Sequence, residues 1–334
     1  MPRTPRLSII VPVHNGGQNL QLCIQALAES SRAPDEVIVV DDGSTDGSAD
    51  QSRRYGACVL RLDGVARGPA FARNRGVEAA SGDIVVFIDA DVVVHLDTLS
   101  HLGRYFVEHP EVAGFFGSYD ADPPAKGLVS RYKNLTHHYV HQHGRREAST
   151  FWAGCGAVRR DAFTEVGGFD ESYTRPSIED IEFGVRLGKA GHRVWLCPDV
   201  LVTHLKHWTL LTLLRSDIRD RAIPWTRLIL HDAHLPDDLN LDATARISAV
   251  AAWSLLWGLA LGFWCSLLWL GTLLAGGALV TMNAGLYRFC WQRGGACFAV
   301  VSMGLHWFYL LYSSLIFVGL AVPAWLTRKV RLGR

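Results

Sequence analysis

The sequence lacks a surplus of charge of either sign, and it lacks paired cysteines. Its 33 Lys and Arg against 32 Asp and Glu leave a formal net charge of +1, so charge gives no argument for binding nucleic acid. The 7 cysteines are scattered, without a C-x-x-C pair or a metal-ligand spacing. Such cysteines are typical of reduced core or membrane residues and suit a catalytic face in the cytosol.

Features that would identify three other kinds of protein are also missing. The first turn, residues 14–19, reads HNGGQN and has no G-x-G-x-x-G fingerprint, which argues against a nucleotide-binding dehydrogenase. No acidic residue lies in the long apolar runs to couple an ion, which argues against a transporter. Residues 1–7 are short and polar, so we expect no cleaved signal peptide.

Long uncharged runs fill the C-terminal part of the sequence. Residues 247–284 contain no charged side chain, and in residues 294–326 only His306 is ionisable. Each run exceeds the roughly 20 residues that a helix needs to cross a bilayer. Trp and Tyr residues lie near the ends of these runs, as in the aromatic belts of membrane interfaces. We therefore expect two or three transmembrane helices in residues 246–326; the alternative is a buried helical hairpin of a soluble protein.

The flanks of these runs predict the orientation. Residues 327–334 form a basic tail, which the positive-inside rule keeps in the cytosol with the N-terminal part, favouring an even number of crossings. The length of the first run, with a possible break at Gly276 and Gly277, instead favours three in total. Residues 211–245 include a basic amphipathic stretch, 215–225, which predicts a helix at the membrane interface. The expected location is the cytoplasmic (inner) membrane, with several crossings.

Residues 1–210 alternate strand patterns with helix patterns. Strands are predicted at residues 7–13, 36–40, 59–62, 84–88 and 112–116, and helices at 20–28, 68–80 and 97–108. This alternation predicts an α/β fold with a mostly parallel central sheet flanked by helices. In such folds ligands bind outside the carboxyl ends of the strands.

Acidic residues follow two of the predicted buried strands. Strand 84–88 runs into Asp89 and Asp91, and strand 36–40 runs into Asp41 and Asp42. An unpaired buried carboxylate is costly, so a core strand that ends in Asp-x-Asp needs a partner or a ligand. One interpretation is an ordinary strand-end turn. The other is a Mn²⁺ or Mg²⁺ site, since these cations prefer carboxylate oxygen and take further ligands from phosphates.

Four segments within residues 7–91 form a recognisable series. They are SIIVPVHN at residues 8–15, VVDDGST at 39–45, ARNRG at 72–76 and FIDAD at 87–91. In this order and spacing they resemble the successive motifs of family 2 glycosyltransferases. The resemblance implies a GT-A fold, which is a nucleotide-sugar-binding α/β domain, over residues 1–210, followed by transmembrane α-helices.

The resemblance also implies roles for residues at the strand ends. It implies that the nucleotide sugar is bound by Pro12, Val13, Asn15, Asp42, Arg73, Asp89 and Ala90. It further implies that a divalent metal, Mn²⁺ or Mg²⁺, is held by Asp91 and Asp89 with His204 as a third ligand. For Arg73 the alternative is a solvated helix charge, and for His204 it is an ordinary pocket histidine.

Two later segments extend the resemblance. Residues 152–160, WAGCGAVRR, resemble the family's acceptor-side segment, which implies that Trp152, Gly154 and Cys155 lie beside the acceptor. Residues 177–183, SIEDIEF, resemble the segment that carries the Glu-Asp motif, so Glu179 and Asp180 are the implied catalytic pair with Asp180 as the base. A simple helix N-cap is the alternative for Asp180, because a helix dipole favours its charged form there.

One segment departs from the family pattern. Residues 126–146 are rich in Tyr and His, and His137, His138 and His141 have the spacing of neighbours on a helix. A zinc site is conceivable there, but no carboxylate pair or cysteine lies nearby. We expect instead a helix that lines the acceptor channel near the membrane.

The predicted function is transfer of a sugar from a nucleotide sugar, with UDP-sugars as the family's usual donors. An acceptor hydroxyl has a pKa far above 7 and needs a general base, whereas a polyprenyl phosphate is already ionised. The implied base therefore favours a membrane-bound inverting transferase that acts on a hydroxyl of a lipid or lipid-linked acceptor. The alternatives are a polyprenyl-phosphate glycosyltransferase and a non-catalytic regulatory module that binds nucleotide sugars.

Overall fold

The computed structural model describes residues 4–232 and 242–332, with side chains to residue 326. The chain divides into two compact units. The first, here the sheet unit, comprises residues 1–126 and 141–207, and the second, the helical unit, comprises residues 127–140 and 208–334. Residues 233–241 of the predicted interfacial segment 211–245 lie outside the described residues.

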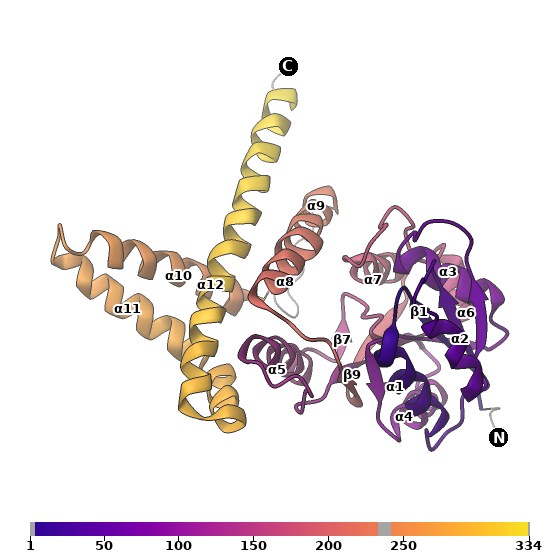
Figure 1. Cartoon of the computed structure of the whole chain (residues 1–334). Coiled ribbons are helices and arrows are strands. Elements are labelled where there is room, and N and C mark those ends of the chain that lie inside the picture. Colours follow the sequence, from indigo (N-terminus) through magenta and orange to yellow (C-terminus); the bar gives the residue numbers. More distant parts are fainter. Residues whose placement is uncertain (1–3, 233–241, 333–334) are drawn as a thin grey trace. The chain divides into compact units, whose positions relative to one another are not determined.

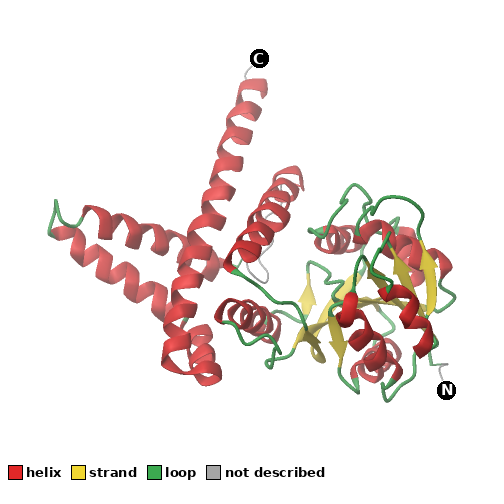
Figure 2. Ribbon diagram, in the orientation of Figure 1, coloured by secondary structure: helices red, strands yellow, loops and turns green. Residues whose placement is uncertain are grey.

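The sheet unit is built on a nine-stranded sheet with helices around it (Figures 1 and 2). Its strands run in the order β3-β2-β1-β4-β8-β6-β9-β5, and β7 pairs with β9. The strands are β1 (Leu7–Val13), β2 (Glu36–Asp41), β3 (Cys58–Arg61), β4 (Ile84–Ile88), β5 (Val92–Val94), β6 (Val112–Tyr119), β7 (Glu147–Ala148), β8 (Cys155–Arg159) and β9 (Arg193–His204).

The predicted α/β fold is confirmed, with a parallel core and a mixed extension. Strands β3, β2, β1 and β4 are parallel neighbours. Beyond them β8 lies antiparallel between β4 and β6, and β6 pairs parallel with β9. The helices of this unit are α1 (Gly17–Ala28), α2 (Ser48–Gln51), the 3₁₀-helix η1 (Ser52–Tyr55), α3 (Pro69–Ala79), α4 (Thr98–Glu108), α6 (Arg160–Glu165) and α7 (Glu179–Lys189). Helix α5 (Leu128–His143) runs from the helical unit into the sheet unit.

Both faces of the central strands are buried, which explains their continuous apolar sequence. On one face Ile9 and Val86 belong to a core cluster with Leu20 of α1. On the other face α3 approaches closely, because a Cβ on Gly76 would lie 2.5 Å from Cγ2 of Ile10. Since neither face of these strands meets water, polar residues are left to the strand ends.

The strand order positions a site at the carboxyl ends of β1 and β4. The chain builds β1, β2 and β3 outwards on one side and then crosses back to add β4 on the other side of β1. This reversal is the topological switch point at which open α/β sheets bind ligands. The segments that leave the sheet there begin with His14 after β1 and with Asp89 after β4.

The helical unit consists of helices in the described residues 127–140, 208–232 and 242–332. They are α8 (Leu210–Arg215), the π-helix η2 (Ser216–Ala222), α9 (Ile223–Asp232), α10 (Ala243–Leu261), α11 (Leu267–Met282) and α12 (Ala284–Leu332), in addition to most of α5. Helix α12 turns at Gly295, whose φ of 76° is left-handed. The predicted break at Gly276 and Gly277 is wrong, because both lie inside α11 and the first apolar run turns at residues 262–266. A Cβ on Gly276 would lie 3.7 Å from Leu255, so a small residue there brings α11 close to α10.

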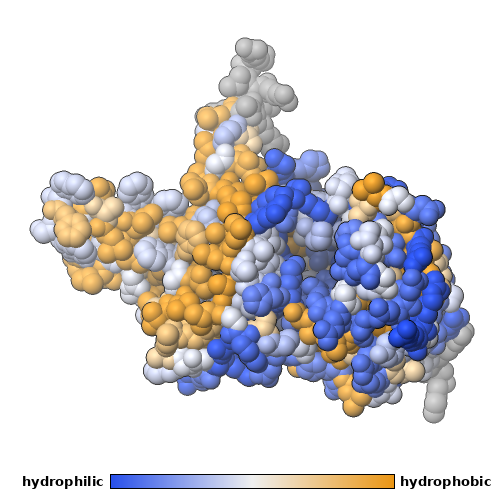
Figure 3. Space-filling model, in the orientation of Figure 1, coloured by the Kyte–Doolittle hydropathy of each residue, from blue (hydrophilic) through white to orange (hydrophobic). Residues whose placement is uncertain are grey.

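Two helices are long and apolar enough to cross a membrane, by length and composition: α10 and residues 284–326 of α12. Only 22% of the apolar window of α10 and 6% of that of α12 is buried within the structure. A core helix of a soluble protein would be mostly buried, so this alternative fits poorly. Figure 3 shows apolar side chains gathered over the visible face of α11 and α12. Helix α11 is apolar but shorter.

Candidate active site

The Asp42 carboxylate, which follows β2, holds the loop that precedes α3. It is 4% exposed and accepts hydrogen bonds from the backbone N–H of Arg67, at 2.9 and 3.0 Å, and of Gly68, at 2.7 Å. Gly68 has a φ of 98°, and a Cβ there would lie 2.5 Å from the backbone of Thr174, so only glycine fits. The sequence predicted that Asp42 binds the nucleotide. The three hydrogen bonds to the loop before α3 account for the burial of its carboxylate.

Asn15 joins the turn after β1 to the loop after β2. Its backbone has a left-handed φ of 55°, and its side-chain oxygen accepts a bond from the Thr45 N–H at 2.8 Å. Its own N–H donates to Ser44 Oγ at 2.9 Å. Pro12 is half-buried, whereas the side chain of Val13 lies in the core. The two loops thus form one hydrogen-bonded edge beside the switch point.

Arg73 of α3 forms a buried bridge between two carboxylates. Its guanidinium donates to Asp89 Oδ1 at 2.7 Å and to Glu179 Oε1 at 2.8 Å, and its side chain is 5% exposed. Burial alone would lower the pKa of Arg73, but Asp89 and Glu179 raise it above its ordinary value. The guanidinium is therefore not a solvated helix charge; it contacts Asp89, one of the residues predicted to bind the nucleotide sugar.

Glu179 and Asp180 begin α7 and have different surroundings. Glu179 is 4% exposed, and its second oxygen accepts the Ser177 N–H at 2.8 Å. Asp180 is half-buried and accepts the Ala153 N–H at 3.1 Å and the Ile181 N–H at 2.8 Å. The Glu179 carboxylate is committed to Arg73, while the Asp180 carboxylate lies against the segment that precedes β8.

Asp91 and His204 come together through strand pairing. Val92 of β5 lies opposite His204 of β9, and the Leu205 N–H bonds to the Asp91 carbonyl at 2.8 Å. This register puts Asp91 Oδ2 3.6 Å from His204 Nε2. Burial would raise the pKa of the Asp91 carboxyl, but His204 and the charge of Lys206 lower it below its ordinary value.

This pair fits a divalent cation. An oxygen and a nitrogen 3.6 Å apart can both reach one ion at about 2.1 Å from each. In the part of the chain that the structure describes, no group of three or more His, Cys, Asp or Glu converges as a metal site. Two protein ligands nevertheless suffice when the phosphates of a substrate supply the others.

The predicted acceptor-side segment lies directly beside Asp89. The Asp89 N–H bonds to the Gly154 carbonyl at 3.3 Å, and Cys155 pairs with Ile88 across β8 and β4. Cys155 is fully buried, and burial raises the pKa of its thiol. Trp152 is half-buried and packs edge-on against Tyr119 at 4.8 Å. Of the three predicted acceptor-side residues, Trp152 is thus the one whose side chain is partly open to solvent.

Tyr119 is a residue of this site that the sequence did not reveal. Its ring stacks on His204 with centroids 4.3 Å apart and planes at 6°. It lies at the end of β6, a strand the sequence predicted to end at residue 116. The strand is three residues longer than predicted. These three residues are small or aromatic, and their sequence has no pattern that predicts a strand or a binding site.

Most of the predicted catalytic and metal-binding residues therefore fall into two connected groups. One runs from Asp89 through Arg73 and Glu179 to Asp180, and the other runs from Asp91 through His204 and Tyr119 to Trp152. Ala90 joins the two groups along the chain and is half-buried. Of the three histidines considered for zinc, His141 bonds through Nδ1 to the Gly117 carbonyl at 3.0 Å.

A polar cluster lies near the second group, formed by His95 directly after β5, Asp120 directly after β6 and Thr203 of β9. His95 Nε2 is 3.0 Å from Asp120 Oδ2 and 3.2 Å from Thr203 Oγ1, and Thr203 also donates to Asp120. The hydrogen bond with Asp120 raises the pKa of His95, against the opposing effect of burial. Burial would raise the pKa of Asp120, but its bonds with His95 and Thr203 lower it.

Two known families match parts of this chain. Residues 8–167 match the family described as Glycosyl transferase family 2, and residues 133–208 match the N-terminal domain of galactosyltransferase. Glycosyltransferase AglE of Haloferax volcanii is 28% identical over 209 residues, which are 60% of this chain and 67% of AglE. The chain spans 28% and 42% of the length of two other curated relatives.

Solved structures share the fold at low sequence identity. A mannosyltransferase of Pyrobaculum calidifontis, in complex with GDP-Man and Mn²⁺, has a TM-score of 0.60 at 19% identity and covers 95% of this chain and 88% of its own. Residues 1–349 of S. aureus TarS, in complex with UDP-GlcNAc, have a TM-score of 0.52 at 20% identity, covering 68% of this chain and 65% of theirs.

We expect Arg73→Met to destabilise the protein by roughly 3–5 kcal/mol, because it leaves buried carboxylates without their partner. Adding Glu179→Gln should recover part of the lost stability, because it removes one of the two buried carboxylate charges that Arg73→Met leaves unpaired. Chemical unfolding of the full-length chain in detergent measures both effects. Arg75→Met is the matched control, since Arg75 is 34% exposed and pairs with Glu78 and Glu171 at the surface. Equal losses for the two arginine variants would contradict the bridge.

The His95–Asp120 pair predicts a pH dependence of stability. A histidine whose pKa is raised in the folded state adds stability that is complete below its unfolded value of about 6.5 and is lost as pH rises through the folded value. We expect the stability of wild type in excess of that of His95→Gln to be lost as the pH rises above about 6.5. Melting temperatures of the two proteins below and above that pH test it; a difference that does not change with pH would disprove the assignment.

Proposed function

We propose that this chain, a nucleotide-sugar glycosyltransferase of family 2, is a membrane-bound enzyme that moves a sugar from a UDP-sugar to a hydroxyl of a lipid or lipid-linked acceptor. The family is an inverting GT-A family. The observation that carries the proposal is the placement of two carboxylates, Asp91 and Asp180, next in the chain to the residues that Arg73 bridges.

On the donor side, the loops after β1 and β2 would hold the nucleotide. Asn15 and Asp42 link these loops through hydrogen bonds, and Pro12 and Val13 supply the end of β1 between them. Asp89, with one oxygen on Arg73, keeps a second oxygen for the ribose or for the metal. Complexes of structural neighbours with GDP-Man and with UDP-GlcNAc support a nucleotide-sugar donor.

Asp91 and His204 would hold Mn²⁺ or Mg²⁺, with Asp89 as a further candidate ligand. When bound, such a cation offsets the negative charge that develops on the leaving diphosphate. The stack of His204 on Tyr119 keeps the imidazole in a fixed plane, which orients its Nε2 towards Asp91. The Mn²⁺ in the mannosyltransferase complex supports this choice of cation.

On the acceptor side, Asp180 would act as the general base. The acceptor hydroxyl gives its proton to the Asp180 carboxylate as its oxygen forms a bond to the anomeric carbon, and the bond from that carbon to the diphosphate breaks. Direct displacement of this kind inverts the anomeric configuration. Trp152 and Gly154 would line the acceptor path, whereas the buried Cys155 supports the strand and Glu179 keeps Arg73 in place.

Two alternative functions remain distinct from this one. A polyprenyl-phosphate glycosyltransferase would need no base, because its acceptor is already ionised at neutral pH. A non-catalytic nucleotide-sugar-binding module would need neither Asp91 nor Asp180. The half-buried position of Asp180, with Ala153 N–H holding one of its oxygens, favours a catalytic use of this carboxylate.

Embedding of the helical unit in the cytoplasmic (inner) membrane supports a lipid acceptor. Helices α10 and α12 have the required length and composition, and large apolar side chains such as Trp257, Phe308 and Leu315 are exposed on them. The basic tail at residues 327–334 would keep the sheet unit in the cytosol. The product would then be a glycolipid of the cell envelope.

We expect Asp180→Asn to lower turnover by about 10²–10⁴-fold, the usual contribution of a general base, while leaving nucleotide binding unchanged. Donor consumption with a hydroxyl-bearing lipid acceptor measures turnover, and calorimetry measures nucleotide binding. Asp170→Asn is the control, since Asp170 is exposed and accepts only a local bond from the Ser172 N–H at 2.9 Å. Near wild-type turnover of Asp180→Asn, with polyprenyl phosphate as acceptor, would favour the first alternative instead.

The proposed orientation predicts that Cys58, which is exposed on the sheet unit, faces the cytosol. In a Cys265→Ser/Cys297→Ser variant, an impermeant maleimide should label Cys58 only after spheroplasts are lysed, and the protein should stay in carbonate-washed membranes. Labelling of intact spheroplasts would contradict the orientation. Release into the carbonate wash would contradict the embedding.

A further inference from the structure

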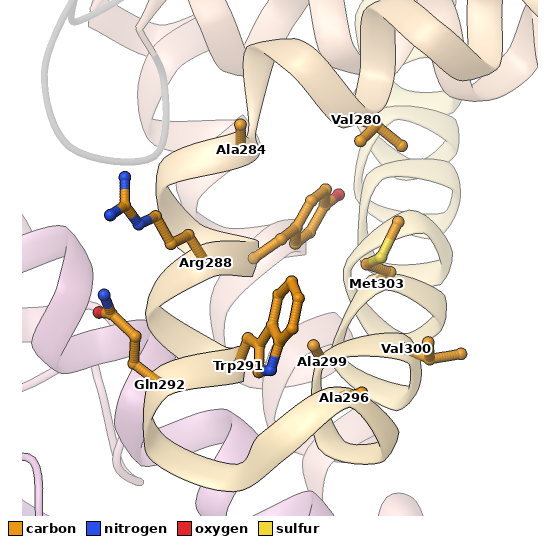
Figure 4. Close-up of a pocket in the computed structure, with 10 residues that line it drawn as sticks. Val280, Ala284, Arg288, Trp291, Gln292, Ala296, Ala299, Val300 and Met303 are labelled. Carbon is orange, nitrogen blue, oxygen red and sulfur yellow. The ribbon is translucent and has the colours of Figure 1, made fainter.

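The first part of α12 folds back on the rest of the helix and forms a groove within the helical unit. Residues 284–294 lead into the left-handed turn at Gly295, and residues 296–303 return beside them (Figure 4). Together with the end of α11 they line a groove of about 690 Å³. Its walls include Val280, Tyr287, Trp291, Val300 and Met303, which are largely apolar.

One permanent positive charge lies at the edge of this apolar groove. Arg288 is exposed, and no hydrogen bond or ion pair joins it to any residue in the described parts of the chain. Gln292 follows one helical turn later, and Figure 4 shows the two polar side chains on the same side of their helix, turned away from Val300 and Met303. An unpaired guanidinium at the edge of apolar walls is a site for an anion with an apolar part.

A neighbouring arginine is used differently, which makes Arg288 distinctive. Arg131 of α5 donates to the Arg293 carbonyl at 2.7 Å, next to the turn, and lies 4.5 Å from the centre of the Phe298 ring. These contacts stabilise the turn at Gly295 and occupy the Arg131 side chain. Arg288 makes no comparable contact, so its charge is available to a ligand.

The surroundings of the groove select the kind of anion. Trp291 and Val300 are 63% and 67% exposed, and a small water-soluble anion would leave both in contact with water. An anionic lipid covers them with its chains while its phosphate accepts the two parallel bonds that a guanidinium donates. Trp291 is also a residue type that favours the interface between lipid and water.

We propose that this groove binds an anionic phospholipid, with its phosphate on Arg288 and an acyl chain against Trp291, Val300 and Met303. The inference rests on the proposed membrane embedding of the helical unit and is independent of sugar transfer. It assigns to α12 a lipid site that holds the helical unit at a defined depth in the membrane.

The test is binding of phosphatidylglycerol to delipidated full-length protein, followed by native mass spectrometry without donor or acceptor. Arg288→Gln should weaken binding by about tenfold, the loss expected for a charge-assisted hydrogen bond. The matched control Arg227→Gln, an exposed arginine on α9, should change it by less than about twofold. Met303→Trp, which fills the groove and keeps the charge, should weaken binding as well.

Three results would overturn the proposal. One is wild-type affinity in either Arg288→Gln or Met303→Trp, and another is an equal loss in Arg227→Gln. The third is displacement of the lipid by an equal concentration of inorganic phosphate, which would identify a simple anion site. Because no step of the assay involves sugar transfer, an inactive enzyme that still binds phosphatidylglycerol would disprove the proposed reaction and leave the lipid site intact.

Discussion

The buried guanidinium of Arg73 is the interaction on which the candidate site depends. Removing a charge from water is costly, so Arg73 is stable in the core only with Asp89 and Glu179 both within 2.8 Å. These two carboxylates come from the end of β4 and the start of α7, which are far apart in the sequence. The bridge therefore fixes the position of their neighbours, Asp91 and Asp180. The proposed chemistry rests on these two carboxylates, which flank the bridge without bonding to Arg73.

A buried ionic group also joins separate elements within the helical unit. The Asp217 carboxylate, in the π-helix η2, is 6% exposed and is held by Lys133 Nζ at 2.6 Å and by the Tyr312 hydroxyl at 2.8 Å. These partners come from α5 and α12, so one buried charge joins three helices. π-Helical segments are uncommon and costly, and tertiary contacts of this kind stabilise them. Each unit thus uses a buried ionic group to fix the geometry of otherwise apolar elements.

Much of this could be predicted from the sequence, because burial on both faces imposes a recognisable pattern. The apolar runs of β1, β2 and β4, and the acids that end β2 and β4, defined the parallel core and its ligand-binding edge. The burial of Arg73 could not be predicted, since it depends on Glu179, 106 residues away in the sequence. The stack of Tyr119 on His204 depends likewise on the register of β6, β9 and β5. The turn at residues 262–266 escaped prediction because its residues are as apolar as the helices it joins.

The most direct test of the account is nucleotide binding to the detergent-purified chain with and without Mn²⁺. UDP, GDP, dTDP and CMP should be compared in wild type and in Asp91→Ala. The account predicts that UDP binds, that Mn²⁺ strengthens this binding, and that Asp91→Ala removes the effect of Mn²⁺. Folded protein that binds none of the four nucleotides, or Mn²⁺-dependent binding that survives Asp91→Ala, would contradict it.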